Sequence, residues 1–186
     1  MVVSPTRIDL PFSENSRTIT VISSEEIKNN PANNVADLLQ SVAGIDIRRR
    51  GVDGMQSDIY IRGGNFNQTL ILIDGFKTED PQTGHHTMNM MVPLDNIERI
   101  EIKKGPAARI YGQNAFSGAI NIVTKTTVSD KLKIEVTGAS FTRLGLGVKT
   151  VANLKKSNYF VNFTYNSSDG YRDKYRLRKL QLFYKK

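Results

Sequence analysis

Two adjacent histidines and one aspartate at the end of an apolar run are the side chains best suited to chemistry. His85 and His86 are the only histidines of the chain. Adjacent residues of an extended chain point to opposite sides, so this pair predicts two polar loop residues more strongly than a metal site. Asp74 ends the run T-L-I-L-I-D and precedes Gly75. It is either a catalytic carboxylate or a turn residue, and the Asp-Gly pair favours the turn.

The other residue patterns that catalysis requires are missing. The chain has no Cys, which excludes disulfides, thiol catalysis and Cys-based zinc sites. It contains neither a P-loop nor a G-x-S-x-G elbow. The arginines at 48–50 are suited to phosphate contact, but no aromatic platform accompanies them, which favours a solvated loop. We therefore expect no enzyme activity, no cofactor and no bound metal.

The charge is distributed unevenly along the 186 residues. Residues 1–126 contain 13 Lys and Arg against 14 Asp and Glu, whereas residues 127–186 contain 13 against 4. The formal net charge of +8 thus comes from the last third, and we place a domain boundary near Thr126. A basic tail is compatible with nucleic-acid binding, which remains an alternative function at this point.

The first part predicts a small α+β domain of short strands and short helices. Ser24 is expected to cap a brief helix, and Asn34 to open a second helix that Gly44 closes. Pro93 to Glu98 predicts one helical turn, and Gly105-Pro106 the start of a further short helix. Strands are expected at 18–23, 45–49, 58–62, 69–74, 100–104 and 119–124.

The last part predicts antiparallel strands of about ten residues with one apolar and one polar face. Leu132, Ile134 and Val136 alternate with polar residues, and similar segments follow near 144–151, 159–166 and from about 175. Such strands face lipid in a transmembrane barrel or pack on the first domain as a soluble meander. The Tyr and Phe residues on the apolar face favour lipid.

Three stretches, in this order, carry a family resemblance. They are I-R-G-G at 61–64, L-I-D-G at 72–75, and the long stretch I-E-R-I-E-I-K-K-G-P-A-A-R-I-Y-G-Q-N-A-F-S-G-A-I-N-I-V-T-K at 97–125. Followed by barrel-like strands, they closely resemble the plug domain of TonB-dependent outer-membrane receptors. The resemblance implies a strap with a partial TonB box at 1–17, a plug domain at 18–126, and the first strands of a truncated barrel at 127–186.

The resemblance also implies roles for individual residues. The family pairs its TonB box with TonB by strand addition, and basic plug residues meet acidic groups of the barrel wall. The matching positions for TonB coupling are Val2, Val3 and Ser4, and those for plug–barrel contact are Arg62, Lys104, Gly63 and Gly105. Plug loops that face outward contact the ligand in this family, and the candidates are Arg50, Gln56, Asn65, Asn67, His85, His86 and Met88.

We therefore expect a protein of the outer membrane, with lipid around its barrel strands. Its partners are TonB and an extracellular nutrient chelate of the siderophore, haem or cobalamin type, with no nucleic acid. A receptor of this class has a wall of 22 strands, and residues 131–186 suffice for about four of ten residues each. The sequence accordingly predicts a fragment, with the rest of the wall absent.

Overall fold

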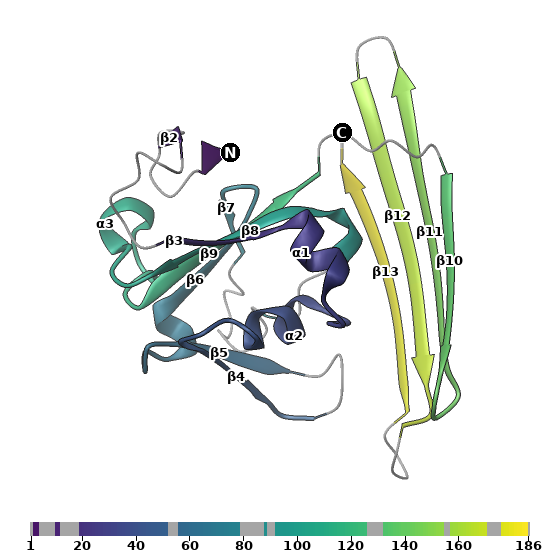
Figure 1. Cartoon of the computed structure of the whole chain (residues 1–186), viewed down its shortest axis with the longest axis horizontal. Coiled ribbons are helices and arrows are strands. Elements are labelled where there is room, and N and C mark those ends of the chain that lie inside the picture. The colour runs from purple at the N-terminus through teal and green to yellow at the C-terminus, as the bar shows by residue number, and fades with distance from the viewer. Residues whose placement is uncertain are drawn as a thin grey trace. The chain divides into compact units, whose positions relative to one another are not determined.

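The computed structural model describes residues 2–3, 10–11, 19–51, 56–78, 88, 92–125, 132–154, 157–170 and 176–185. The chain divides into two compact units, the first comprising residues 1–50 and 56–125 and the second mainly residues 126–186 (Figure 1). Within the described ranges, no helix is long and apolar enough to cross a membrane.

The centre of the first unit is a five-stranded sheet in the order β3-β8-β9-β6-β7 (Figure 1). Strands β6 and β9 run parallel, and the other neighbouring strands are antiparallel. The strands are β3 (Ile19–Ser23), β6 (Thr69–Ile73), β7 (Phe76–Lys77), β8 (Ile97–Lys104) and β9 (Gly118–Thr124). The two-residue strand β7 was not expected from the sequence, and β8 starts three residues earlier than expected, directly after a 3-10 helix at Leu94–Asn96.

Polar caps determine where the two longer helices begin. The helix α1 (Ser24–Asn29) is capped by Ser23, one residue before the expected position, because Ser23 and Glu26 form a capping box. The helix α2 (Val35–Gln40) begins after Asn34, whose side chain accepts a hydrogen bond from the Asp37 N–H.

Two predicted helix boundaries were wrong. The helix α2 ends with Ser41 as its C-cap, so Gly44 lies beyond the helix and serves the following turn with φ 80°. Pro106 is not the first helical residue, since α3 comprises only Ala108–Tyr111 and Ala107 precedes it.

Buried apolar side chains lie on both faces of the sheet, on the helices and on a separate hairpin. The hairpin consists of β4 (Ile45–Arg49) and β5 (Ser57–Ile61), with Ile47 opposite Ile59. Burying each Leu or Ile stabilises the fold by about 1.5–3 kcal/mol. The largest buried side chains, each at most 2% exposed, are Leu38, Leu39, Ile59, Ile61, Leu70, Ile71, Leu72, Ile97, Ile100, Ile102, Ile120 and Ile122.

The N-terminal strap contains one short described strand pair. β1 (Val2–Val3) pairs antiparallel with β2 (Leu10–Pro11).

The second unit is a four-stranded antiparallel sheet in sequence order. It consists of β10 (Leu132–Ala139), β11 (Arg143–Leu154), β12 (Ser157–Ser168) and β13 (Leu177–Lys185). The register places its apolar residues on one face, and these are exposed rather than buried, as expected of lipid-facing strands. The large exposed side chains of this face are Leu132, Ile134, Val136, Leu144, Leu146, Leu180, Leu182 and Tyr184.

Candidate functional site

The I-R-G-G stretch forms a tight turn that presents Arg62. Arg62 and Gly63 have φ values of 50° and 82°, and Ile61 and Gly64 bridge across them. This is the two-residue pattern of a type I′ turn. The Arg62 N–H donates to the Gly44 carbonyl at 3.1 Å, which ties this turn to the turn that follows α2. An arginine with positive φ is uncommon, and here the surrounding contacts hold it with its side chain exposed.

Lys104 and Gly105 lie beside this turn. A Cβ added at Gly105 would lie 3.6 Å from Nη1 of Arg62, and Gly105 has φ 112°, which side chains rarely adopt. Nζ of Lys104 donates to the Ala43 carbonyl at 2.6 Å. The structure thus brings together Arg62 and Gly105, and holds Lys104 and Arg62 against neighbouring residues of the same turn, Ala43 and Gly44.

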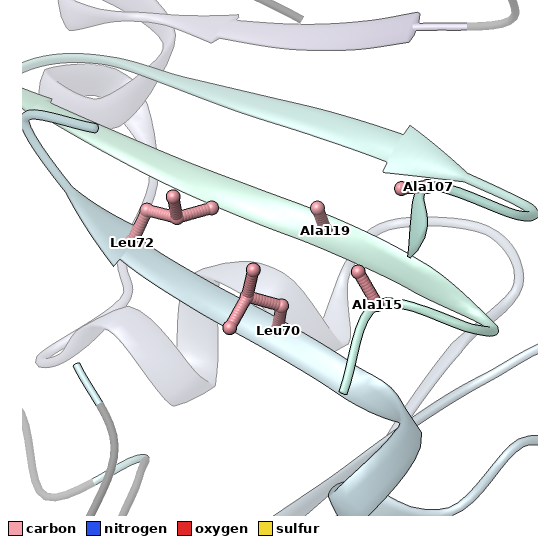
Figure 2. Close-up of a cluster of buried hydrophobic side chains, with 5 residues drawn as sticks. All are labelled: Leu70, Leu72, Ala107, Ala115 and Ala119. Atoms are coloured by element: carbon pink, nitrogen blue, oxygen red, sulfur yellow. The ribbon is translucent and has the colours of Figure 1, made fainter. Parts of the chain in front are cut away.

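The loop after Gly105 packs on the sheet through two alanines. Figure 2 shows Leu70 and Leu72 of β6, Ala119 of β9, and the loop residues Ala107 and Ala115 gathered over one face of the sheet. The Ala107 N–H donates to the Ala115 carbonyl at 2.8 Å, and neither alanine is more than 1% exposed. This bond ties the first half of the G-P-A-A-R-I-Y-G stretch to Ala115, and Arg109 of the same stretch is exposed.

A second set of contacts joins this loop to the residues after the I-R-G-G turn. Ser117 donates to the Gln68 carbonyl through its N–H at 2.9 Å and through its hydroxyl at 2.8 Å. A Cβ on Gly64 would collide with the Ser117 side chain, so only glycine permits this approach. The sequence gives no signal for these partners, because they depend on the parallel pairing of β6 with β9, which places Thr69 opposite Gly118.

Asp74 is the turn residue favoured by the sequence, and the structure adds a partner for it. Asp74 and Gly75 connect β6 to β7 with φ values of 50° and 82°. The Asp74 carboxylate accepts the Thr124 N–H at 2.7 Å and the Thr124 hydroxyl at 2.6 Å. The carboxylate therefore fastens the turn to the last residue of β9, which is a structural role.

A polar network continues from this turn across the sheet. The Gly75 N–H donates to Asn121 Oδ1 at 3.0 Å, and Asn121 Nδ2 donates to Glu101 Oε2 at 3.2 Å. Arg99 pairs with the other carboxylate oxygen of Glu101 at 2.8 Å. Glu101 and Asn121 also line a small hollow with Ile19, Lys103, Tyr111 and Ala119.

The candidate ligand residues Arg50 and Gln56 close the base of the β4–β5 loop. Nε of Arg50 lies 3.4 Å from the Asp58 carboxylate, and Gln56 Nε2 donates to Asp58 at 3.3 Å. Asp58 itself is 2% exposed, whereas the Arg50 side chain is 62% exposed. The pair therefore fixes the loop, and Arg50 keeps most of its surface accessible.

The remaining candidate residues have different environments. Asn65 and Asn67 are both exposed, the first as the N-cap and the second as the middle residue of the 3-10 helix Phe66–Gln68. The Asn65 N–H donates to Gln68 Oε1 at 3.2 Å. Met88 is 8% exposed, so its side chain is buried. His85, His86 and Ser4 lie outside the described residues, while Val2 and Val3 form β1. All of these residue roles stay predictions.

Two neighbouring loops of the second unit are joined through Asp169. The Asp169 N–H donates to the Phe141 carbonyl at 3.0 Å, and Arg176 Nε donates to the Asp169 carboxylate at 3.1 Å. Hydrogen bonds from the Thr142 side chain and from Arg176 lower the pKa of Asp169 below its ordinary value. In the part of the chain that the structure describes, no group of three or more His, Asp or Glu residues is placed to hold a metal ion.

A family model that matches more than half of the chain shows which family the chain belongs to. Residues 11–119 match the family model described as the TonB-dependent receptor plug domain. The chain belongs to this family. TonB-dependent receptors are outer-membrane proteins and transporters rather than enzymes, and the chain is accordingly assigned to the outer membrane.

Similar proteins cover both units. The vitamin B12 transporter BtuB of Vibrio vulnificus (strain CMCP6) is 33% identical over 162 residues, which are 87% of this chain and 26% of the transporter. The ferric-catecholate import receptor Fiu of E. coli K12 has a TM-score of 0.70 and 25% identity over 92% of this chain and 24% of the receptor. The P. aeruginosa receptor FpvA has a TM-score of 0.73 at 19% identity over 90% of this chain and 22% of that structure, which shows a shared fold.

These matches confirm the α+β plug followed by strands of an incomplete barrel. The chain spans about a quarter of the length of the relatives that it matches. The nucleic-acid alternative receives no support from them.

Proposed function

We propose that the chain is the plug and the opening barrel strands of a TonB-dependent receptor that takes up a scarce nutrient chelate without any chemical step. The observation that carries this proposal is the plug-family match at residues 11–119, followed directly by strands whose apolar face is exposed. A plug that fills a polar lumen needs a nearly neutral, polar surface, and lipid-facing strands need an apolar one. The first unit is nearly neutral in charge, and the strands of the second unit expose an apolar face.

TonB is proposed to bind the chain at Val2, Val3 and Ser4 and to transmit energy to the plug through them. Strand addition requires an extended segment with accessible backbone groups, and Val2 and Val3 already have strand conformation. Pro5 follows directly and removes one donor, which limits the segment available to TonB.

A peptide of residues 1–12 tests this coupling. It should bind the periplasmic domain of TonB, and Val3→Pro should weaken binding because proline removes an N–H from the added strand. Asp9→Asn is the matched control, since it keeps every backbone donor. Equal affinity of the Val3→Pro and wild-type peptides would refute strand addition at this position.

The proposed contact between the plug and the barrel wall involves Arg62, Lys104, Gly63 and Gly105. Arg62 has no carboxylate partner among the described residues, and the Gly105 backbone lies next to its guanidinium. Acidic groups on the barrel wall are the proposed partners, because a guanidinium binds a carboxylate in bidentate geometry. Lys104 lacks that fork and supplies a point charge.

The ligand is proposed to contact the loops that contain Arg50, Gln56, Asn65, Asn67, His85, His86 and Met88. The relatives include a vitamin B12 transporter and a ferric-catecholate import receptor, so the proposed ligand is a cobalamin or a ferric siderophore. Haem is a third candidate. Uptake of radiolabelled cyanocobalamin and of ferric catecholate by cells whose only such receptor contains this chain distinguishes these classes. Uptake that persists without TonB would overturn the proposal.

A further inference from the structure

The turn between β10 and β11 carries an exposed aromatic side chain on a strained backbone. Phe141 and Thr142 have φ values of 63° and 53°, a region that suits glycine and is rare for aromatic residues. The Phe141 side chain is 59% exposed, so its burial does not offset the strain. Backbone strain that packing does not repay is typical of positions with a function beyond the local fold.

Hydrogen bonds from the connection between β12 and β13 hold this turn in place. The Phe141 carbonyl accepts the Asp169 N–H at 3.0 Å and the Ser168 hydroxyl at 3.3 Å. Nε of Arg176 donates to the Asp169 carboxylate at 3.1 Å, yet the Arg176 side chain remains 65% exposed. The turn and the connection therefore form one hydrogen-bonded group that presents Phe141 and Arg176 to the surroundings.

Arg178 adds a second cation at the end of the apolar face of β13. It lies opposite Ser167, and the alternation of the strand places it on the same face as Leu180, Leu182 and Tyr184. All four of these β13 residues are exposed. The exposed face of β13 thus has one cationic end that continues directly into an apolar stretch.

The charges at this end of the sheet do not cancel among the described residues. Hydrogen bonds from the Thr142 side chain and from Arg176 lower the pKa of Asp169, so this carboxylate is ionised at neutral pH. Asp169 forms an ion pair with Arg176, whereas Arg178 acts on it only at longer range. One carboxylate therefore faces two guanidinium groups. We call Phe141, Arg176 and Arg178 the rim.

The lengths of the strand connections place the rim at the outward end of the proposed barrel strands. Residues 155–156 connect β11 to β12, whereas the longer segment 169–176 connects β12 to β13. In barrels of the outer membrane, short turns face the periplasm and longer loops face outward. The rings of Tyr159 and Tyr184, 6.4 Å apart, lie toward the other end of the apolar face. This face is thus bordered by aromatic rings at one end and by the rim at the other.

We propose that the rim binds the phosphorylated headgroup of an acylated lipid in the outer leaflet of the membrane. This inference rests on the proposed function, because it requires β10–β13 to lie in lipid. Guanidinium groups bind phosphate oxygens in bidentate geometry, and an exposed Phe packs at the boundary between headgroups and acyl chains. A lipid matches both parts of the surface, since its acyl chains would cover Leu180 and Leu182 next to the arginines. A soluble anion would contact the arginines alone.

Lipid titration of a receptor that contains this chain tests the proposal. The probes are lipid A with its phosphates, lipid A without phosphate, and inorganic phosphate, each added to delipidated receptor in detergent micelles. Arg176→Gln with Arg178→Gln should weaken binding of the phosphorylated lipid about 25-fold, since each arginine near an anionic surface contributes about fivefold. Lys179→Gln is the matched control, because Lys179 adjoins Arg178 on β13 but lies on the polar face opposite Asn166.

Two further variants separate lipid binding from a purely structural role. Asp169→Asn keeps the N–H that holds the turn but removes the charge that competes with phosphate, so it should tighten binding by up to about fivefold. Phe141→Gly relieves the positive φ and should leave the urea midpoint of the receptor unchanged or raised. It should nevertheless weaken binding of the phosphorylated lipid about tenfold, because it removes the apolar contact with the acyl chains.

The expected result is binding that depends on the lipid phosphate, that the double arginine variant loses, and that Lys179→Gln keeps. Equal affinity of the double variant and the wild type would overturn the inference, as would weaker binding by Asp169→Asn. Inorganic phosphate that binds as tightly as the lipid would overturn it too, by showing a site for free anions. Nutrient uptake by the wild-type receptor is a separate readout: uptake that persists without TonB would overturn the proposed function instead.

Discussion

At the scale of single residues, side chains near strand ends hold the first unit together. Ser23 and Glu26 start α1, while Asp74 fastens a turn to Thr124 on a different strand. Both carboxylates act as hydrogen-bond acceptors with several donors each. Their contributions can be measured separately, because they lie on different elements.

Asp74→Ala should lower the free energy of unfolding by about 1–3 kcal/mol, because it leaves the Thr124 N–H and hydroxyl without their acceptor. Urea unfolding of the chain in detergent, followed by circular dichroism, measures the change. Asp46→Ala is the control, since it breaks only an exposed pair with Arg48 and should cost about 0–1 kcal/mol. Equal losses for the two variants would contradict the role of Asp74.

Acid should weaken the N-terminus of α1. The Ser23 N–H and then the Ser23 hydroxyl lower the pKa of Glu26. Because the pKa is lower in the folded chain, this stabilisation is present above the ordinary glutamate pKa and is lost as the pH falls through the folded value. Glu26→Gln should therefore flatten the pH dependence of the urea midpoint below about pH 5. A slope identical to that of the wild type would refute the link.

At the scale of elements, the sequence predicted most strands of both units and the turn at Asp74. Alternation and β-branched residues reveal strands locally, whereas their neighbours depend on contacts far along the chain. The two-residue strand β7 is too short to show periodicity. The first boundary shifted because Ser23, and not Ser24, forms the capping box with Glu26. The helix α3 begins after Ala107, whose N–H is bonded to the distant Ala115 carbonyl.

The candidate site was predicted in part for the same reason. The I-R-G-G and K-K-G-P stretches identified Arg62 and Gly105, which the structure brings together. Ser117 has no motif of its own, and only the pairing of β6 with β9 places it beside Gln68. Spacing along the sequence therefore could not identify it.

The strands β10–β13 should tolerate charge on only one face. Leu146→Lys places a charge on the apolar face and should destabilise the inserted receptor by about 2–4 kcal/mol if the residue lies near the bilayer midplane. Gln181→Lys on the polar face is the control and should have little effect. Urea titration of receptor folded into phosphatidylcholine vesicles compares them. Equal destabilisation would contradict the assignment of the two faces.

At the scale of the whole molecule, the two units have surfaces for different surroundings. The described sheet of the second unit has β10 and β13 as its outer strands, each paired on one side only among the described strands. Unpaired strand edges next to an apolar face promote association between chains. The printed 186-residue chain should therefore self-associate when produced alone in water.

Sedimentation velocity tests this behaviour, with and without detergent. Detergent covers the apolar face and should reduce the size of the particles, whereas added salt should not. A monodisperse monomer in plain buffer, with protected amides in all four strands, would show that the sheet edges need no partner.

The strand order of the first unit also has a consequence for how the protein reaches its destination. The central strands β8 and β9 are encoded last, while β3, β6 and β7 precede them. Until Thr124 has emerged from the translocation machinery, the earlier strands lack the neighbours that complete their hydrogen bonds. Contacts between distant segments form slowly. The five-stranded sheet can therefore be completed only once both β8 and β9 have been exported.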